Sequence, residues 1–236
     1  ADASADVGSM SLAQLMQLEV TSVSKQPEQL RLAPAAITVL TREDIRRSGS
    51  TTIPDLLRLV PGVQVSETSS SVWAIGARGF AGRFARSLLV LVDGRSVYTP
   101  SFSGVYWETQ DLPLDEIERI EVIRGPGATL WGANAVNGVI NIITRSSRDT
   151  QGGLVTATAG SSEPVNTSAR YGGKLGGSGT YRLFANYFRR DQSVNAAGDP
   201  NRDDWQAGMG GVRADWKPGT ANSYTLEGAL YGRGAG

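Results

Sequence analysis

The 236-residue sequence predicts an α+β domain, a small mixed sheet with short helices, followed by antiparallel β-strands of an incomplete transmembrane β-barrel. Residues 18–145 mix short helical periods with short apolar runs. Residues 146–236 instead alternate apolar and polar side chains between glycine-rich turns. We therefore expect a polar leader at 1–17, the α+β domain at 18–145 and about five barrel strands at 146–236.

Two short helices are expected early in the α+β domain. Thr41 precedes the first helix and Thr52 precedes the second, and an aspartate follows each threonine three residues later, as in a capping box. Gly49 ends the first helix, and Pro61-Gly62 ends the second. The first helix is therefore predicted over 42–47, and the second between Thr52 and Pro61.

The rest of this domain reads as short strands. The apolar run 88–92 is followed by Asp93-Gly94, a dipeptide that is typical of a tight hairpin turn. The expected strands are 35–40, 63–65, 74–78, 88–92, 95–98, 120–123 and 139–143, with a further short helix at 115–118.

The residues after 145 predict five longer strands, at 153–160, 166–175, 179–190, 205–216 and 222–232. In the fifth, Tyr224, Leu226 and Leu230 fall on one face and polar residues on the other. Tilted strands of this length can cross a bilayer, but five strands cannot close a barrel. A soluble antiparallel sheet would show the same alternation, and the third strand has aromatic residues on both faces, so that alternative stays open.

Composition excludes most catalytic chemistry. The chain has no cysteine and no histidine, which removes disulfides, thiolate nucleophiles, histidine bases and the usual zinc sites. Lys plus Arg equals Asp plus Glu at 23 each, so no net charge draws the chain to nucleic acid. We expect no enzyme, no catalytic residue, no metal site, no cofactor and no nucleic-acid partner.

The segment 124–145 (RGPGATLWGANAVNGVINIITR) is the most distinctive in the chain. Its glycines allow sharp turns around Trp131, and a dense β-run follows. A glycine-rich loop can cradle a phosphate, and an enzyme of that kind could use Asp115 and Glu118. Against that interpretation, the segment lacks a Lys-Ser or Lys-Thr ending and is followed by a strand where a helix is required.

Together with residues 117–123, this segment closely resembles the end of the plug domain of TonB-dependent outer-membrane receptors. Three further segments, in the same order, are each similar to a plug segment of that family: 34–63 (PAAITVLTREDIRRSGSTTIPDLLRLVPGV), 75–80 (IGARGF) and 88–98 (LLVLVDGRSVY). The resemblance spans nearly all of residues 18–145. It implies a plug inside a barrel of about 22 strands, of which residues 146–236 would be the first.

The resemblance also implies a TonB box just before the plug. Such a box pairs edge to edge with a strand of TonB, the periplasmic energy transducer, through backbone hydrogen bonds. The alternative is an ordinary linker. The segment in the matching position is Glu19, Val20, Thr21, Ser22 and Val23.

In this family the outward-facing plug loops contact the ligand, and here they correspond to 67–73 and 98–107. Aromatic faces beside arginines would suit a flat, anionic ligand such as a ferric siderophore. The rings could equally anchor the loops. The ligand-binding candidates are Trp73, Arg83, Tyr98, Phe102, Tyr106 and Trp107.

Arg78 and Arg124 resemble the paired arginines that lock the plug to acidic residues of the barrel wall in this family. Arginines in a polar lumen need carboxylate partners. Such partners would lie mostly beyond residue 236; otherwise we expect pairing inside the plug, for example with Glu118 or Glu121.

The function implied by the resemblance is TonB-energised uptake of a scarce nutrient, most often a ferric siderophore, through the outer membrane of a Gram-negative bacterium. The partners implied are TonB, a metal chelate and outer-membrane lipid. Uptake of cobalamin, another metal chelate or an oligosaccharide, and a soluble ligand-binding module without a barrel, are the alternatives.

Overall fold

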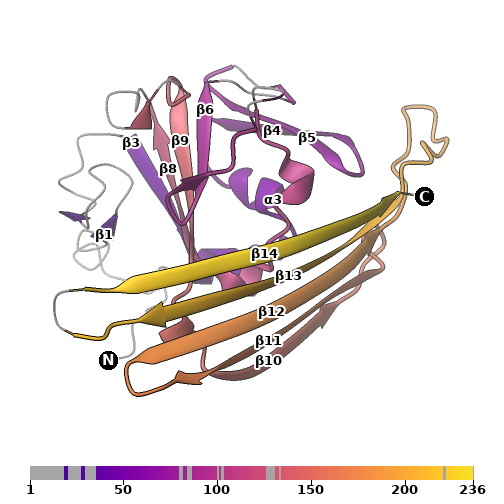
Figure 1. Ribbon diagram of the computed structural model, residues 1–236. Helices are drawn as coiled ribbons and strands as arrows, with labels where there is room; N and C mark the ends of the chain where they lie inside the picture. Colours follow the sequence, from indigo (N-terminus) through magenta and orange to yellow (C-terminus); the bar gives the residue numbers. More distant parts are fainter. Residues whose placement is uncertain are drawn as a thin grey trace. The chain divides into compact units, whose positions relative to one another are not determined.

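The computed structural model describes residues 19–20, 28–29, 36–79, 82–83, 87–99, 101, 104–125, 131–132, 134–219 and 222–235. The chain divides into two compact units (Figure 1). The first comprises residues 1–66, 73–110 and 114–144, and the second comprises 67–72, 111–113 and 145–236. The predicted leader at 1–17 lies outside the described residues.

The first unit is built on a mixed sheet of five strands in the order β3-β8-β9-β6-β7. β6 and β9 run parallel, and the other neighbours are antiparallel. The strands are β3 (Ala36–Thr41), β6 (Leu88–Val92), β7 (Arg95–Ser96), β8 (Ile117–Arg124) and β9 (Gly138–Thr144). The predicted small mixed sheet is therefore confirmed.

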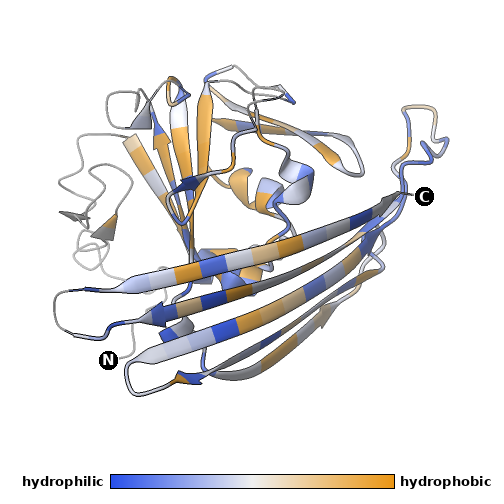
Figure 2. Cartoon of the chain, viewed as in Figure 1, coloured by the Kyte–Doolittle hydropathy of each residue, from blue (hydrophilic) through white to orange (hydrophobic). Residues whose placement is uncertain are grey.

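Both faces of this sheet are apolar and covered. On one face Leu89, Ile123 and Val139 pack with Ala135, and Trp131 packs against this cluster. On the other face the neighbouring strands present further buried aliphatic residues: Val90, Val122, Ile140 and Ile142. Strands buried on both sides are expected to be continuously apolar, which explains the unbroken run of β6 (Figure 2).

The two predicted helices are present, α2 at Arg42–Arg47 and α3 at Ile53–Leu57. Thr41 forms a capping box with Asp44: the threonine Oγ1 accepts the Asp44 N–H at 3.3 Å, and the aspartate Oδ2 accepts the Thr41 N–H at 2.9 Å. Thr52 accepts the Asp55 N–H at 3.1 Å in the same way. Each cap satisfies an amide that the first helical turn leaves unpaired.

The Asp93-Gly94 turn between β6 and β7 is also confirmed. Both residues have positive φ, 48° and 78°, as a two-residue hairpin turn requires. The Asp93 carboxylate then accepts the Thr144 N–H and the Thr144 hydroxyl, each at 2.8 Å. The turn residue thus fixes the end of β9.

Two local predictions differ from the structure. The loop expected at 67–73 is mostly strand, because β4 (Val63–Ser69) continues into a tight hairpin with β5 (Val72–Ala77). The helix expected at 115–118 is one 3₁₀ turn at Leu114–Glu116, and β8 already starts at Ile117. The end of β4 is rich in serine and threonine, so it was predicted as a loop. The acidic residues of the 3₁₀ turn were interpreted as the start of a longer helix.

The second unit is a meander of five antiparallel strands, β10 to β14 in sequence order. They are β10 (Gly152–Thr158), β11 (Val165–Leu175), β12 (Gly179–Arg190), β13 (Trp205–Trp216) and β14 (Tyr224–Ala235). The predicted bounds of the third and fourth long strands are correct, and the others differ by one to three residues. Within the described residues, no helix is long and apolar enough to cross a membrane.

Candidate functional site

The segment predicted as the TonB box is described only at its first two residues. Glu19 and Val20 form strand β1, which pairs antiparallel with β2 (Glu28–Gln29). Val20 is fully buried. Thr21, Ser22 and Val23 lie outside the described residues. The structure therefore shows that the start of this segment is extended and that its backbone already takes part in a short strand pair.

The two predicted lock arginines lie beside each other. Arg78 donates from Nη2 to the backbone oxygen of Arg124 at 3.4 Å, and Arg124 donates from Nη1 to the backbone oxygen of Pro61 at 3.0 Å. Within the described part of the chain, neither guanidinium has a carboxylate within ion-pair distance. The pairing with Glu118 or Glu121 that we considered is therefore not what the structure shows; Glu121 is instead paired with Arg119 at 2.8 Å.

Backbone geometry supports this placement of the arginines. Arg78 has a φ of 58° and is followed by Gly79 at 83°, so the ARG motif turns in the left-handed region. A non-glycine residue there is uncommon and stores strain, a feature that often accompanies function. The two cations are thus held close together by backbone oxygens rather than neutralised.

The ligand-binding candidates do not all share one environment. Trp73 and Trp107 are buried, at 3% and 4% exposure, whereas Tyr98 and Tyr106 are partly exposed. Arg83 is exposed and its Nη2 lies 3.3 Å from Oε1 of the buried Glu108. Phe102 lies outside the described residues.

The loop that carries the tyrosines is a narrow turn. The Thr99 N–H donates to Gly104 O at 2.7 Å, and the Gly104 N–H donates back to Thr99 O at 3.4 Å. The 3₁₀ turn η2 (Trp107–Thr109) follows and places Trp107 in the interior. The loop is therefore anchored by a buried ring and presents its tyrosines closer to the surface.

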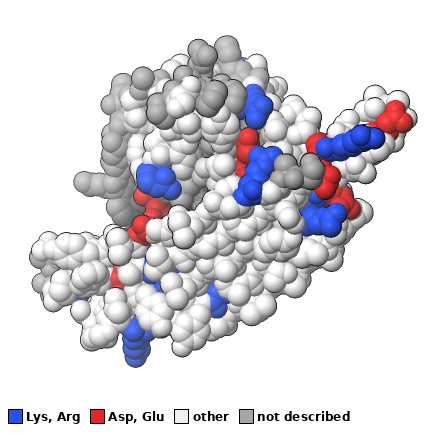
Figure 3. Space-filling view, turned by 45° about the vertical axis from the view of Figure 1, so that its right-hand side comes forward, with Lys and Arg blue, Asp and Glu red and all other residues white. Residues whose placement is uncertain are grey.

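The five-stranded sheet has an apolar outer face. Directly paired residues of antiparallel strands share a face, so the register places Tyr171, Leu183, Val212 and Gly228 in one row across four strands. The neighbouring rows are similar, and Figure 3 shows few charged side chains on the visible face of these strands. Large apolar residues on this face are strongly exposed: Val155, Tyr171, Leu175, Leu183, Tyr187, Trp216, Tyr224, Leu226 and Leu230.

The inner face is the reverse: its polar residues are buried. Along β12 the buried positions on this face include Arg182, Asn186 and Arg190, alternating with the exposed Leu183, Ala185 and Tyr187. A soluble sheet buries its apolar face and exposes its polar face. This inversion is the pattern of a barrel wall with a lipid-facing exterior and a polar interior.

Aromatic residues gather at one end of the outer face. Tyr171 lies 6.4 Å from Tyr181, and Trp216 lies 5.9 Å from Tyr224, between ring centroids. These pairs lie toward the end where the short turn 176–178 joins β11 to β12. The opposite end carries the longer connection 191–204. Outer-membrane barrels show such an aromatic girdle at the interface, with short periplasmic turns and longer outer loops.

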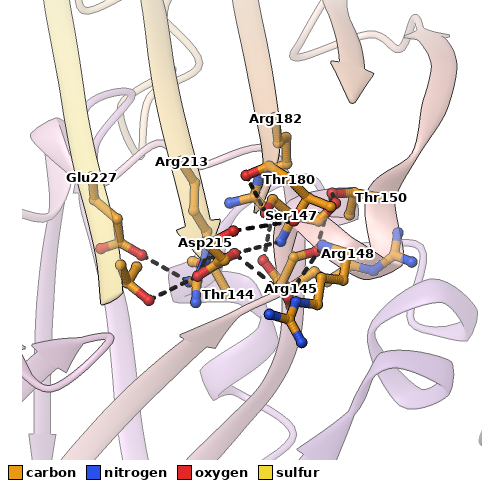
Figure 4. Close-up of polar contacts among 12 residues, drawn as sticks. Thr144, Arg145, Ser147, Arg148, Thr150, Thr180, Arg182, Arg213, Asp215 and Glu227 are labelled. Atoms are coloured by element: carbon orange, nitrogen blue, oxygen red, sulfur yellow. Dashed lines mark hydrogen bonds and ion pairs between the residues drawn. The ribbon is translucent and has the colours of Figure 1, made fainter. Parts of the chain in front are cut away.

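A hydrogen-bonded cluster, the junction clamp (Arg145, Ser147, Thr180, Arg182 and Asp215), holds the start of the second unit to its strands (Figure 4). Arg182 donates to Arg145 O at 2.6 Å. The Ser147 N–H donates to Asp215 Oδ2 at 2.8 Å, and the two hydroxyls of Ser147 and Thr180 lie 2.6 Å apart. Every one of these five residues is buried or partly buried.

Asp215 is the centre of the clamp. Arg213 donates to it at 2.9 Å, and Thr225 donates at 2.7 Å, while Arg213 also reaches Glu227 at 2.7 Å. The clamp links η4 (Ser147–Thr150) to three consecutive strands, β12, β13 and β14. Sequence reasoning missed the clamp, because its residues are ordinary polar residues from distant strands.

Comparisons with known proteins were consistent with this geometry. Residues 29–139 match the model of the TonB-dependent Receptor Plug Domain family. A ferric enterobactin receptor of Pseudomonas aeruginosa is 33% identical over 216 residues, covering 80% of this chain and 28% of that receptor. The chain therefore spans less than a third of the length of this curated relative. The matched family is a receptor family rather than an enzyme family.

Solved receptors share the fold. The pyoverdine outer membrane receptor FpvA from Pseudomonas aeruginosa PAO1 superposes with a TM-score of 0.73 at 20% identity, covering 92% of this chain and 31% of that one. The ferric-catecholate import receptor Fiu from E. coli K12 gives 0.67 at 22% identity, covering 88% and 28%. Residues 29–139 are thus a TonB-dependent receptor plug domain, and the antiparallel strands that follow share the fold of the first wall strands of outer-membrane receptors.

Proposed function

We propose that this chain is the gate and part of the wall of a receptor that takes up a ferric siderophore, with TonB as its energy source. The observation that carries the proposal is the joining of a plug domain at 29–139 to a sheet whose apolar face is exposed and whose polar face is buried. The first part supplies a gate, and the second supplies a wall suited to lipid on one side and a polar lumen on the other. No catalytic role is proposed.

The siderophore class rests on the names of the relatives. The 33%-identical relative is a ferric enterobactin receptor, and solved neighbours are receptors for pyoverdine and ferric catecholates. Metal chelates of this kind are anionic and aromatic or flat, which suits arginine and tyrosine at the outer plug loops.

For ligand contact we propose Arg83 together with Tyr98 and Tyr106. Arg83 is exposed, and its Nη2 lies 3.3 Å from Oε1 of Glu108, a contact that positions the guanidinium at the surface. Trp73 and Trp107 are buried, so we expect them to support the loops. Phe102 remains a candidate outside the described residues.

For energy coupling we propose that the segment Glu19–Val23 pairs with a strand of TonB. Support comes from the extended backbone at Glu19–Val20 and its existing pairing with Glu28–Gln29, which shows that this backbone can form a ladder. A partner strand would take over that ladder by β-augmentation. The side chains then matter less than the backbone donors.

The experiment compares Val20→Pro with Val20→Ala in cells whose own siderophore receptors are deleted. Proline removes the backbone N–H at this position and alanine keeps it. We expect Val20→Pro to abolish uptake of radioactive ferric enterobactin or ferric pyoverdine while cell-surface binding persists, and Val20→Ala to retain uptake. Normal uptake by Val20→Pro would refute the coupling assignment. Absence of binding and uptake of either chelate by the unmodified receptor would refute the siderophore assignment.

A further inference from the structure

The tip of the β4–β5 hairpin, residues 67–72, belongs to the second unit and not to the sheet of the plug. The N–H, the hydroxyl and the carbonyl of Ser70 all form hydrogen bonds there. Its N–H donates to Asp203 Oδ2 at 2.8 Å, its hydroxyl donates to Asp203 O, and its carbonyl accepts from Trp205 Nε1 at 2.9 Å. Ser70 and Ser71 are buried, at 4% and 6% exposure.

Asp203 joins this hairpin tip to the connection between β12 and β13. Besides Ser70, its carboxylate accepts the Ser193 N–H and the Ser193 hydroxyl, both at 2.7 Å. Burial raises the pKa of Asp203, but the hydrogen bonds from Ser70 and Ser193 outweigh it, and the pKa lies below its usual value. The carboxylate is therefore charged at neutral pH and forms charge-assisted bonds, which are stronger than neutral ones.

A packed aromatic and cationic group supports the same contact. Trp205 is buried and meets the Phe188 ring edge to face, with centroids 4.9 Å apart. The guanidinium carbons of Arg190 and Arg233 lie 5.2 Å and 4.8 Å from the Trp205 ring centroid. Arg233 also donates to Ser71 Oγ at 3.1 Å. The indole that holds Ser70 is thus fixed from several directions.

A second plug-derived segment, 111–113, is held by the same strands. Asp111 accepts from the Tyr231 hydroxyl at 3.5 Å and lies 3.9 Å from Arg190. Arg190 is itself paired with Glu163 at 2.8 Å. Two short stretches of plug sequence therefore take their partners from the wall strands, at the end that carries the longer connection 191–204.

We propose that the hairpin tip at Ser70–Ser71 is a fixed anchor on the wall, held by Asp203, Trp205 and Arg233, and that it stays bound while the rest of the plug rearranges during transport. The division between the two units passes through both strands of the hairpin, between residues 66 and 67 and between 72 and 73. In this proposal the hairpin strands, which cross that division, are the segment that bends.

The physical argument compares the two ends of the hairpin. Releasing the tip would break four hydrogen bonds, one of them to the charged carboxylate of Asp203, and leave the buried Ser70 without these partners. A buried polar group without a partner is costly, and more so when it is charged. A change of backbone dihedrals beside a fixed tip costs far less, so bending precedes release.

The first test measures anchoring without any transport. These 236 residues contain no cysteine, so Ser71→Cys introduces one buried thiol into this part of the receptor. In outer-membrane vesicles carrying the receptor, Asp203→Asn should raise the labelling rate of that thiol with a membrane-impermeant maleimide by about tenfold, the effect of losing one charge-assisted bond. The matched control is Asp204→Asn, the same change at the next residue, where the described structure has no hydrogen bond to the side chain.

Equal labelling rates in the Asp203→Asn and Asp204→Asn backgrounds would overturn the anchor. If Asp203→Asn does not assemble, Ser70→Ala serves instead, because it removes only the hydroxyl bond to Asp203 O. A faster labelling rate in Ser70→Ala supports the anchor, and an unchanged rate counts against it.

The second test asks whether the anchor persists during transport, and so rests on the proposed function. Ser71→Cys with Arg233→Cys is crosslinked by a short bis-maleimide, and iron uptake is compared with the same variant left uncrosslinked. A fixed anchor predicts equal uptake. Loss of uptake only after crosslinking shows that the tip must leave the wall, which contradicts the proposal. Absence of uptake before crosslinking would count against the proposed transport function. The anchor would then be judged by the labelling rates of the first test.

Discussion

Arg83 was predicted from the sequence as a ligand-binding residue, and the structure shows what surrounds its side chain. Its side chain is half exposed, and Glu108, whose Oε1 lies 3.3 Å from Arg83 Nη2, is buried. Because the guanidinium is half exposed, solvent screens this ion pair, and its contribution to stability is small, on the order of 1 kcal/mol. The residue is therefore available for a role in ligand binding without being needed for the fold.

We predict that Arg83→Gln weakens binding of a ferric siderophore by roughly tenfold, the effect of one lost charge-assisted contact. The thermal stability of the receptor should be unchanged. Binding is measured by titration of the purified receptor with ferric enterobactin, with Arg148→Gln as the control, since Arg148 belongs to η4 and is exposed. Equal affinities of the two variants would remove Arg83 from the site.

The sequence alone identified residues whose hydrogen-bond partners lie nearby in the chain. It did not identify residues whose partners lie far away in the chain. Thr41 and Thr52 were predicted as caps, because a cap and its aspartate lie three residues apart. Asp203 and Ser70 are 133 residues apart in sequence and were not singled out. Nothing in a single sequence indicates which distant serine a given aspartate will bind.

The wall strands carry the clearest information at the scale of elements. Their bounds could be predicted because period-two alternation extends through whole strands, and β12 and β13 were placed correctly. Alternation alone did not say which face of the sheet is buried. The burial of Arg182 and Asn186 beside the exposure of Leu183 shows that the apolar face is the exposed one.

We predict that Leu230→Arg, on the outer face of β14, destabilises the receptor in lipid by about 2–4 kcal/mol, the cost of an arginine near the bilayer centre. Leu230 is 83% exposed, so the same change in a soluble sheet would be nearly neutral. Val194→Arg is the matched control: Val194 is 66% exposed but lies in the connection 191–204, outside the strands. Guanidinium unfolding in lipid vesicles measures both. Equal stability of the two variants would contradict a lipid-facing β14.

The β4–β5 hairpin is the element that sequence reasoning described least well. Residues 66–71 are Ser-Glu-Thr-Ser-Ser-Ser, a run with low strand propensity, so a loop was expected. The tip is ordered by partners supplied from the second unit instead, through Asp203 and Trp205. Tertiary contacts here override local preference.

At the scale of the whole molecule, the arginine pair is the feature that calls for a partner. Arg78 and Arg124 donate to backbone oxygens and, among the described residues, have no carboxylate within ion-pair distance. Two adjacent cations repel one another, which favours an arrangement in which acidic groups approach them. We propose that carboxylates of the receptor's barrel wall fill this role and lock the plug.

We predict that Arg124→Gln loosens the plug in the receptor. Loss of a charge-assisted pair costs about 1.5–3 kcal/mol, which should lower the thermal stability of the receptor and increase entry of a large antibiotic such as vancomycin. Arg95→Gln is the control, because Arg95 is an exposed arginine of the β6–β7 hairpin. Arg124→Gln cells as resistant and as stable as Arg95→Gln cells would show that no lock depends on Arg124.

The strand order β3-β8-β9-β6-β7 has a mechanical consequence. β3 is the edge strand nearest the N-terminus and its ladder begins with the pair Ala36 and Arg124, whereas β9 is central and runs directly into the junction clamp. Tension applied ahead of β3 reaches the pair Ala36 and Arg124 before the rest of the β3–β8 ladder. Under the coupling proposed above, the edge strand β3 is therefore the part of this sheet that a pull on the N-terminal segment reaches first.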